Sequence, residues 1–185
     1  KDDESFYMQS LSAATGATLE NSPTYSVSGG NLNVQSINKN NGAFSYDVFV
    51  VFGSFTGNLS IEGRLLISAG GYDAFYAVFQ QGIINRFEFV NSRSLGSTGN
   101  DFGYAAEIRN DNFVLAGSFE GTVDFDPNNS VTQSLTSNGL SDGFIVEYPV
   151  LNTGNLRFYN QVGGTGADAI RTLSIPSNDV VYFGW

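Results

Sequence analysis

The chain has 185 residues, of which 41% are hydrophobic, and its 18 acidic and 8 basic residues give a net charge of -10. This charge opposes phosphate backbones and anionic lipid, so we expect no nucleic acid partner. Histidine and cysteine are both absent, which excludes Ser-His-Asp and Cys-His catalysis, thiol redox chemistry and ordinary zinc sites.

The composition also predicts the fold class. The chain contains 22 glycines, 16 phenylalanines and 9 tyrosines, a mixture that favours short strands joined by tight turns, so we expect an all-β protein. No apolar run approaches the length of a membrane span, which predicts no direct membrane insertion. The first residues, KDDESFYMQS, contain no apolar signal core, so we expect any export signal to lie outside this segment.

The first predicted elements form an incomplete unit and a divergent one. The stretch ESFYMQSLS, residues 4–12, loosely resembles INRFEFVNS (84–92) and NLRFYNQVG (155–163). Residues 1–12 are therefore predicted to be the last strand of a preceding unit plus a linker. Residues 13–94 form the divergent unit, in which NKNNGAFSYD (38–47) is an inserted hairpin.

Residues 95–161 are predicted to form one complete unit with four strands. Glycine, asparagine and aspartate turn signals separate the strands. The strands are GYAAEI (103–108), NFVLAGSF (112–119), DGFIVEY (142–148) and LRFYNQV (156–162). Because FVLAG is apolar on both faces, this strand must lie between packed neighbours.

The second unit repeats in the last part of the chain. Residues 95–118 align without a gap on residues 162–185, with a period of about 67 residues, so 162–185 is predicted to hold the first two strands of a further unit. The matching residues are Gly96, Thr98, Gly99, Asp101, Ile108 and Gly117 with Gly163, Thr165, Gly166, Asp168, Ile175 and Gly184. A second alignment sets 68–79 on 137–148, and Gly-Ser-Phe at 53–55 returns at 117–119.

Four strands per repeat is the pattern of a β-propeller blade, in which radial packing buries both faces of each small antiparallel sheet. Closed propellers use roughly four to eight blades, or roughly 270 to 540 residues at this period. We therefore expect a β-propeller segment that is incomplete and stops in mid-blade.

The succession GGTG-x-D, FVLAGSF, EGTVDFDP, LTSNG-x-x-D-x-FIVEY and GNL-x-F resembles the bacterial SBBP-type β-propeller repeats. The resemblance covers nearly the whole chain, and residues 101–163 match closely. The first unit departs from it, because SFTGNLSIEGRLLIS (54–68) replaces the acidic loop. The resemblance implies a large secreted or surface-attached bacterial protein with no common catalytic motif in the repeat.

The stretch GSFEGTVDFDPNN, residues 117–129, is a candidate metal site. Asp124, Asp126 and Asn128 stand at alternate positions and offer the oxygen ligands that calcium prefers. The EF-hand pattern fails, however, because Pro127 holds the fourth position and Leu135 the twelfth. The alternative is a structural turn with Asx hydrogen bonds, in which Val123 and Phe125 point inward and both aspartates point outward.

The other acidic residues divide into two groups. Asp73 with Asp142 and Asp101 with Asp168 recur at equivalent positions, so we expect them to cap turns. Five glutamates have no recurring counterpart and no local motif that would make two of them a glycosidase pair. These are Glu62, Glu88, Glu107, Glu120 and Glu147.

We expect most of the aromatic side chains to lie in the hydrophobic core. Three phenylalanine pairs recur in register and are predicted to pack between units, whereas Tyr72, Tyr104 and Trp185 are less constrained and leave open a sugar-stacking role. The recurring pairs are Phe75 with Phe144, Phe87 with Phe158, and Phe55 with Phe119. The glycines of GSTGND and GGTGAD are turn glycines, because no P-loop lysine follows them.

These observations favour a non-enzymatic scaffold or adhesive and binding module at the cell surface or outside the cell. The expected partners are other segments of the same or a neighbouring envelope protein, and glycans. No cofactor is expected apart from calcium at the acidic turn. Two alternatives remain: a propeller enzyme acting on polysaccharide, and a structural element of a surface filament or envelope assembly.

Overall fold

The computed structural model describes residues 5–7, 24–40, 46–82, 87–128, 131–150, 155–177 and 180–184. Trp185 and most of residues 1–23 lie outside the described residues. The expected all-β class is confirmed, because the described residues form antiparallel sheets of two to four strands. Within those ranges there is no helix long and apolar enough to cross a bilayer.

Two four-stranded sheets have the same up-and-down order. The first contains β3 (Leu32–Lys39), β4 (Val48–Phe55), β7 (Asp73–Gln81) and β8 (Phe87–Leu95). The second contains β9 (Phe102–Arg109), β10 (Asn112–Phe119), β13 (Asp142–Pro149) and β14 (Phe158–Val162). The four strands predicted in the second unit are therefore confirmed. We call the two sheets the first and second unit.

Each unit has a hairpin between its second and third strand. In the first unit this hairpin is β5 (Asn58–Ile61) and β6 (Arg64–Ile67), and β1 (Ser5–Tyr7) and β2 (Thr24–Ser28) add to it as a sheet in the order β1-β2-β5-β6. In the second unit it is β11 (Thr122–Asp124) and β12 (Ser134–Thr136). The acidic stretch is thus the turn region of a hairpin that returns to the sheet at Asp142.

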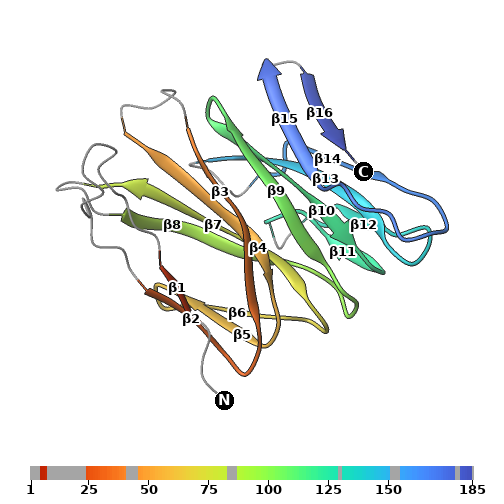
Figure 1. The fold of residues 1–185 in the computed structure, drawn as a ribbon, viewed down its shortest axis with the longest axis horizontal. Coiled ribbons are helices and arrows are strands. Elements are labelled where there is room, and N and C mark those ends of the chain that lie inside the picture. Colours follow the sequence, from red (N-terminus) through yellow and green to blue (C-terminus); the bar gives the residue numbers. More distant parts are fainter. Residues whose placement is uncertain are drawn as a thin grey trace.

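A third, two-stranded sheet follows the second unit. It pairs β15 (Thr172–Ser177) with β16 (Val180–Gly184). Figure 1 shows the first strands of the three successive sheets, β3 in orange, β9 in green and β15 in blue, lying side by side across the molecule.

The core lies between the sheets. The largest apolar cluster joins the first unit to the second, and a smaller cluster joins the second unit to β15. A third cluster packs the other face of the first unit on the β2-β5-β6 sheet. β10 is buried along its whole length because it has apolar residues on both faces and a packed neighbour on each side.

The recurring phenylalanines lie in the core with one exception, although Phe55, Phe75 and Phe87 pack on the β2-β5-β6 sheet and not between the two units as predicted. Five of the six are at most 9% exposed: Phe55, Phe75, Phe87, Phe119 and Phe144. Phe158 is 46% exposed, so its assignment to the core was wrong. The reason is register: Phe87 pairs with Gln81 in β7, whereas Phe158 pairs with Glu147, nearer the middle of β13. A shift in strand register changes what covers a side chain.

The contacts between consecutive sheets repeat. The amide of Gly71 donates to the carbonyl of Gly99 at 3.0 Å, and the amide of Leu140 donates to the carbonyl of Gly166 at the same distance. A second pair of backbone hydrogen bonds also recurs between consecutive sheets. These run from Asp101 N to Tyr72 O at 2.6 Å and from Asp168 N to Ser141 O at 2.8 Å. The loop before the third strand of one unit therefore holds the entry to the next sheet in the same way twice.

Candidate functional site

The acidic turn is stabilised by its own hydrogen bonds. One carboxylate oxygen of Asp124 accepts the backbone N–H groups of Asp126 and Gln133, both at 3.0 Å. Asp126 accepts the backbone N–H of Asn128 at 2.7 Å and the side-chain amide of Gln133 at 2.5 Å. The predicted Asx bonds are confirmed.

The turn also places a ring in the core. Phe125 is fully buried and packs on Phe144 with ring centroids 5.1 Å apart, and its carbonyl accepts the hydroxyl of Tyr148 at 2.7 Å. Val123 is buried as predicted, but Asp126 is only 4% exposed. Its prediction as an outward-pointing residue was wrong, because the loop folds back and Gln133 covers it.

The three candidate calcium ligands belong to one turn, and calcium binding there stays a prediction. Asp124, Asp126 and Asn128 lie together in the loop, and no cluster of three or more acidic, cysteine or histidine side chains suited to a metal occurs in the described ranges. The hydrogen bonds accepted by Asp124 and Asp126 close the turn. The donor N–H groups therefore already occupy carboxylate oxygens that a cation would need as ligands.

The four recurring aspartates cap turns, as predicted. Each carboxylate accepts the backbone N–H of the residue four positions earlier, which closes the glycine-rich loop before the strand or sheet entry. The pairs are Asp73 with Ala69, Asp101 with Ser97, Asp142 with Asn138, and Asp168 with Gly164. Because this bond is needed in every unit, these carboxylates are explained by the fold.

Two of these caps titrate abnormally. Burial raises the pKa of Asp101 to about 7, against the opposing effect of the backbone N–H groups of Ser97 and Glu120, and the Asp73 charge adds to the rise. Burial also raises the pKa of Asp73 to about 6, opposed by the N–H of Ala69. Both carboxyls lie at the junction of the first and second units.

Two glutamates near the second unit have structural contacts. Glu147 forms an ion pair with Arg109, in which one guanidinium nitrogen donates to both carboxylate oxygens at 3.1 and 3.0 Å. Burial raises the pKa of Glu107, and a hydrogen bond with the Asn38 side chain opposes the rise. Glu147 is therefore held by a cation within its own sheet and is only 8% exposed.

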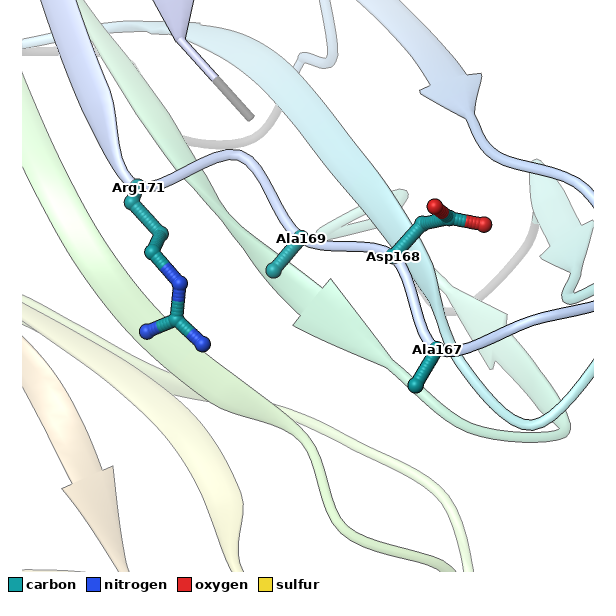
Figure 2. A pocket seen from close by; sticks show the side chains of 4 residues that line it. All are labelled: Ala167, Asp168, Ala169 and Arg171. Carbon is teal, nitrogen blue, oxygen red and sulfur yellow. The ribbon is translucent and has the colours of Figure 1, made fainter.

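A cleft lies between β9 and the segment that enters β15. It encloses about 130 Å³, and an adjoining hollow of about 360 Å³ is lined by Ala167, Asp168, Ala169 and Arg171. The residues around the cleft come from the second unit and the entry segment: Asn100, Phe102, Tyr104, Ser118, Glu120, Ser141, Ala167, Asp168, Ala169 and Arg171. In Figure 2 the Arg171 side chain extends over β9, whereas the Asp168 carboxylate points the other way.

Three aromatic rings form a row that starts outside the cleft at Tyr72 and continues into it with Phe102 and Tyr104. Tyr72 and Phe102 have ring centroids 5.2 Å apart, and Phe102 and Tyr104 are stacked at 6.1 Å. The guanidinium carbon of Arg171 lies 4.7 Å from the centre of the Tyr104 ring, a cation–π contact. We call these three rings, together with the arginine that packs on the last of them, the aromatic row: Tyr72, Phe102, Tyr104 and Arg171.

A β-bulge sets the position of Tyr104. The register between β9 and β10 pairs Gly103 with Gly117 and Ala105 with Ala116, so Tyr104 has no opposite residue. A bulge redirects a side chain away from the regular alternation of the strand. β3 has a shift at the same place, where Gln35 stands between the paired residues Val34 and Ser36.

Sequence reasoning singled out Tyr72 and Tyr104 as open to a binding role and considered Glu120 only as a glutamate without a local motif, and it missed Phe102 and Arg171. The signal was in the repeat: Phe102 and Tyr104 correspond to Ala169 and Arg171, so the residue type changes where the turn residues do not. In comparisons with known proteins, no family model matches the chain and no curated protein matches it.

Proposed function

We propose that the chain is a segment of a β-propeller in which the two units are blades, and that it acts without catalysis as a scaffold or binding module. The main support is the repeated junction. The bonds from Gly71 to Gly99 and from Leu140 to Gly166 have the same length. A radial array requires every pair of successive sheets to pack in the same geometry.

The propeller also accounts for the buried faces. The second unit is covered on both sides by apolar clusters that it shares with the first unit and with β15, as a blade between neighbours would be. The first strands β3, β9 and β15 lie side by side, which in a propeller is the position of the innermost strands. The SBBP-type resemblance of the repeat supports the same proposal.

The proposed setting is a secreted or surface-attached bacterial protein. The repeat resemblance supports this setting, and a net charge of -10 suits a soluble module that does not bind nucleic acid. The proposed partners are other segments of the same or a neighbouring envelope protein, and glycans. The glycan partner is supported by the aromatic row.

A polysaccharide-acting enzyme is a second candidate, and one observation favours it. Glu120 and Asp168 line the same cleft, and glycosidases act with two carboxyl groups across a sugar site. Both carboxylates also accept backbone N–H groups, of Asn100 at 2.9 Å and of Gly164 at 2.8 Å. These bonds give each carboxylate a structural role, which supports the non-enzymatic function.

A turnover assay separates the two candidates. The chain is incubated with a panel of polysaccharides and chromogenic glycosides, and new reducing ends or released chromophore are measured. We expect no turnover. Turnover that Glu120→Gln and Asp168→Asn abolish, and that the buried ion-pair variant Glu147→Gln retains, would establish the enzyme instead.

Calcium at Asp124, Asp126 and Asn128 remains a hypothesis beside this proposal. A ligand that binds the native state alone raises its melting temperature. Thermal melting with millimolar calcium or with a chelator therefore tests the turn. A rise with calcium that Asp124→Asn removes would assign a metal site, and equal melting temperatures would leave a purely structural turn.

A further inference from the structure

The internal repeat separates residues that the fold needs from residues that it does not. Gly99 and Asp101 recur as Gly166 and Asp168, and both aspartates make the same capping bond. Between and beside these fixed positions the residue types change. Where the residue type differs between two copies of the unit, the fold does not require one particular side chain, as it does at the recurring positions.

The changing positions line the cleft. Asn100, Phe102 and Tyr104 correspond in the next repeat to Ala167, Ala169 and Arg171, and all six border the cleft. The cleft is therefore built from equivalent positions of two consecutive repeats. The structural function of these strands is already fulfilled by the glycines, the aspartates and the bulge.

The small residues create the space. Ala169 stands where the preceding repeat has a phenylalanine, and Ala167 where it has an asparagine. The hollow of about 360 Å³ is lined by these two alanines with Asp168 and Arg171, as Figure 2 shows. The hollow alone reaches the volume of small-ligand sites, about 300 to 1,000 Å³, whereas the cleft that holds Phe102, Tyr104 and Glu120 encloses about 130 Å³. A ligand would therefore occupy the cleft and the hollow together, with the aromatic wall of the second unit on one side.

The charges of the lining select the ligand class. Arg171 supplies only donors, whereas the carboxylate of Glu120 supplies acceptors; the Asp168 carboxylate points away from Arg171 and accepts the N–H of Gly164. An anion would meet Glu120 and a cation would meet the guanidinium. Hydroxyl groups both donate and accept, so an uncharged polyhydroxylated molecule suits both side chains.

The aromatic row supplies the apolar surface. Phe102 and Tyr104 are half-buried rings at the cleft. The Arg171 guanidinium lies over one face of the Tyr104 ring, so a sugar that stacks on that face displaces the guanidinium, which is then free to bond its hydroxyl groups. The carbon–hydrogen faces of a sugar ring pack on such surfaces while the hydroxyl groups reach polar neighbours.

We propose that the cleft between β9 and the entry to β15 binds an uncharged saccharide, with Tyr104 as the stacking residue and Arg171 and Glu120 as hydrogen-bonding residues. This proposal adds a location and a ligand class to the proposed binding function. It depends on that function only for the expectation that the partner is a glycan. The cleft itself lies wholly within the two consecutive repeats described.

The test measures binding of the whole chain to neutral oligosaccharides by glycan array and titration calorimetry. The panel holds cello-, xylo-, manno- and malto-oligosaccharides, with oligogalacturonates as anionic and chitosan oligomers as cationic probes. We expect neutral oligosaccharides to bind, and Tyr104→Gln, which introduces the residue type of the bulge in β3, to weaken binding about tenfold or more. Ala169→Phe, which restores the ring of the preceding repeat, should block the hollow and abolish binding.

Phe158→Ala is the matched control, because it removes an exposed ring on β14 that does not border the cleft. Its affinity should equal that of the unchanged chain, and all variants should keep the same melting temperature. Binding to charged probes alone, no binding, or binding unaffected by Tyr104→Gln and Ala169→Phe would overturn the site. Cleavage of a bound neutral oligosaccharide would overturn the non-enzymatic function instead, and its loss in Ala169→Phe would still support the site.

Discussion

Tyr76 and Tyr148 are neighbouring buried tyrosines whose hydroxyl groups have different surroundings. Their rings lie 5.4 Å apart in the cluster between the two units. The hydroxyl of Tyr148 donates to the carbonyl of Phe125, whereas that of Tyr76 is buried and has no hydrogen-bond partner among the described residues. A buried polar group without a partner costs free energy that its partnered equivalent does not.

Opposite effects are therefore expected from the same substitution at these two sites. Tyr76→Phe should raise the free energy of unfolding by about 1 kcal/mol, and Tyr148→Phe should lower it by about 1 to 2 kcal/mol. Urea unfolding of both variants measures the two changes. Destabilisation by Tyr76→Phe equal to that of Tyr148→Phe would show that the Tyr76 hydroxyl is bonded in solution.

The buried caps predict a dependence of stability on pH. The pKa values of Asp73 and Asp101 are raised in the folded chain to about 6 and about 7, above the value of about 3.9 for an unfolded aspartate. The folded chain therefore retains protons that the unfolded chain has lost, so this contribution to stability is complete below pH about 4 and is lost as the pH rises to about 7.

Urea unfolding between pH 4 and pH 8 measures this effect. We expect the free energy of unfolding to fall across the window and the fall to be smaller in Asp101→Asn, which removes the group with the larger rise. An unchanged slope in Asp101→Asn would contradict the assignment of the titration to this junction.

At the scale of the elements, the Gly-Ser-Phe glycines determine how the first strand of a unit crosses the second. Gly117 pairs with Gly103 beside the bulge at Tyr104, and a side chain at Gly117 would place its Cβ 1.9 Å from the carbonyl oxygen of Phe102. The same approach occurs at Gly53, where the distance to the carbonyl oxygen of Asn33 would be 2.0 Å. The glycine thus makes room for the bulged strand.

Gly117→Ala should lower the free energy of unfolding by about 3 kcal/mol or more, because backbone on both strands would have to shift. Gly166→Ala is the matched control, since a Cβ at that position would meet no atom within 4 Å and the backbone there is not left-handed. Thermal melting of both variants tests the difference. Equal melting temperatures would mean that the bulge does not depend on Gly117.

The sequence predicted the strands of the second unit because turn residues and apolar runs are local signals. The repeat also identified Asp73, Asp101, Asp142 and Asp168 as caps, since recurrence shows which positions the backbone requires. It did not predict the exposure of Phe158, because pairing register depends on where bulges fall. The repeat marked the positions of Phe102, Tyr104 and Arg171 as variable, but their contact was not predictable, because Arg171 meets Tyr104 only through the packing of one repeat on the next.

At the scale of the whole molecule, sheets alternate with apolar clusters, and the first strands β3, β9 and β15 of successive repeats lie side by side. The same junction bond recurs at Gly71 and at Leu140, and the proposed propeller explains this recurrence as one rotation applied twice. A propeller requires these rotations to share an axis that passes beside β3, β9 and β15. A stack of repeats that rises along an axis would use the same strands without a common centre.

A crystal structure of the chain measures this geometry most directly. The rotation that superposes the first unit on the second is compared with the rotation that superposes β9 and β10 on β15 and β16. We expect equal rotations about one common axis, with no translation along it beyond coordinate error. Unequal rotations, or a steady translation along the axis, would contradict the propeller and favour a different repeat architecture.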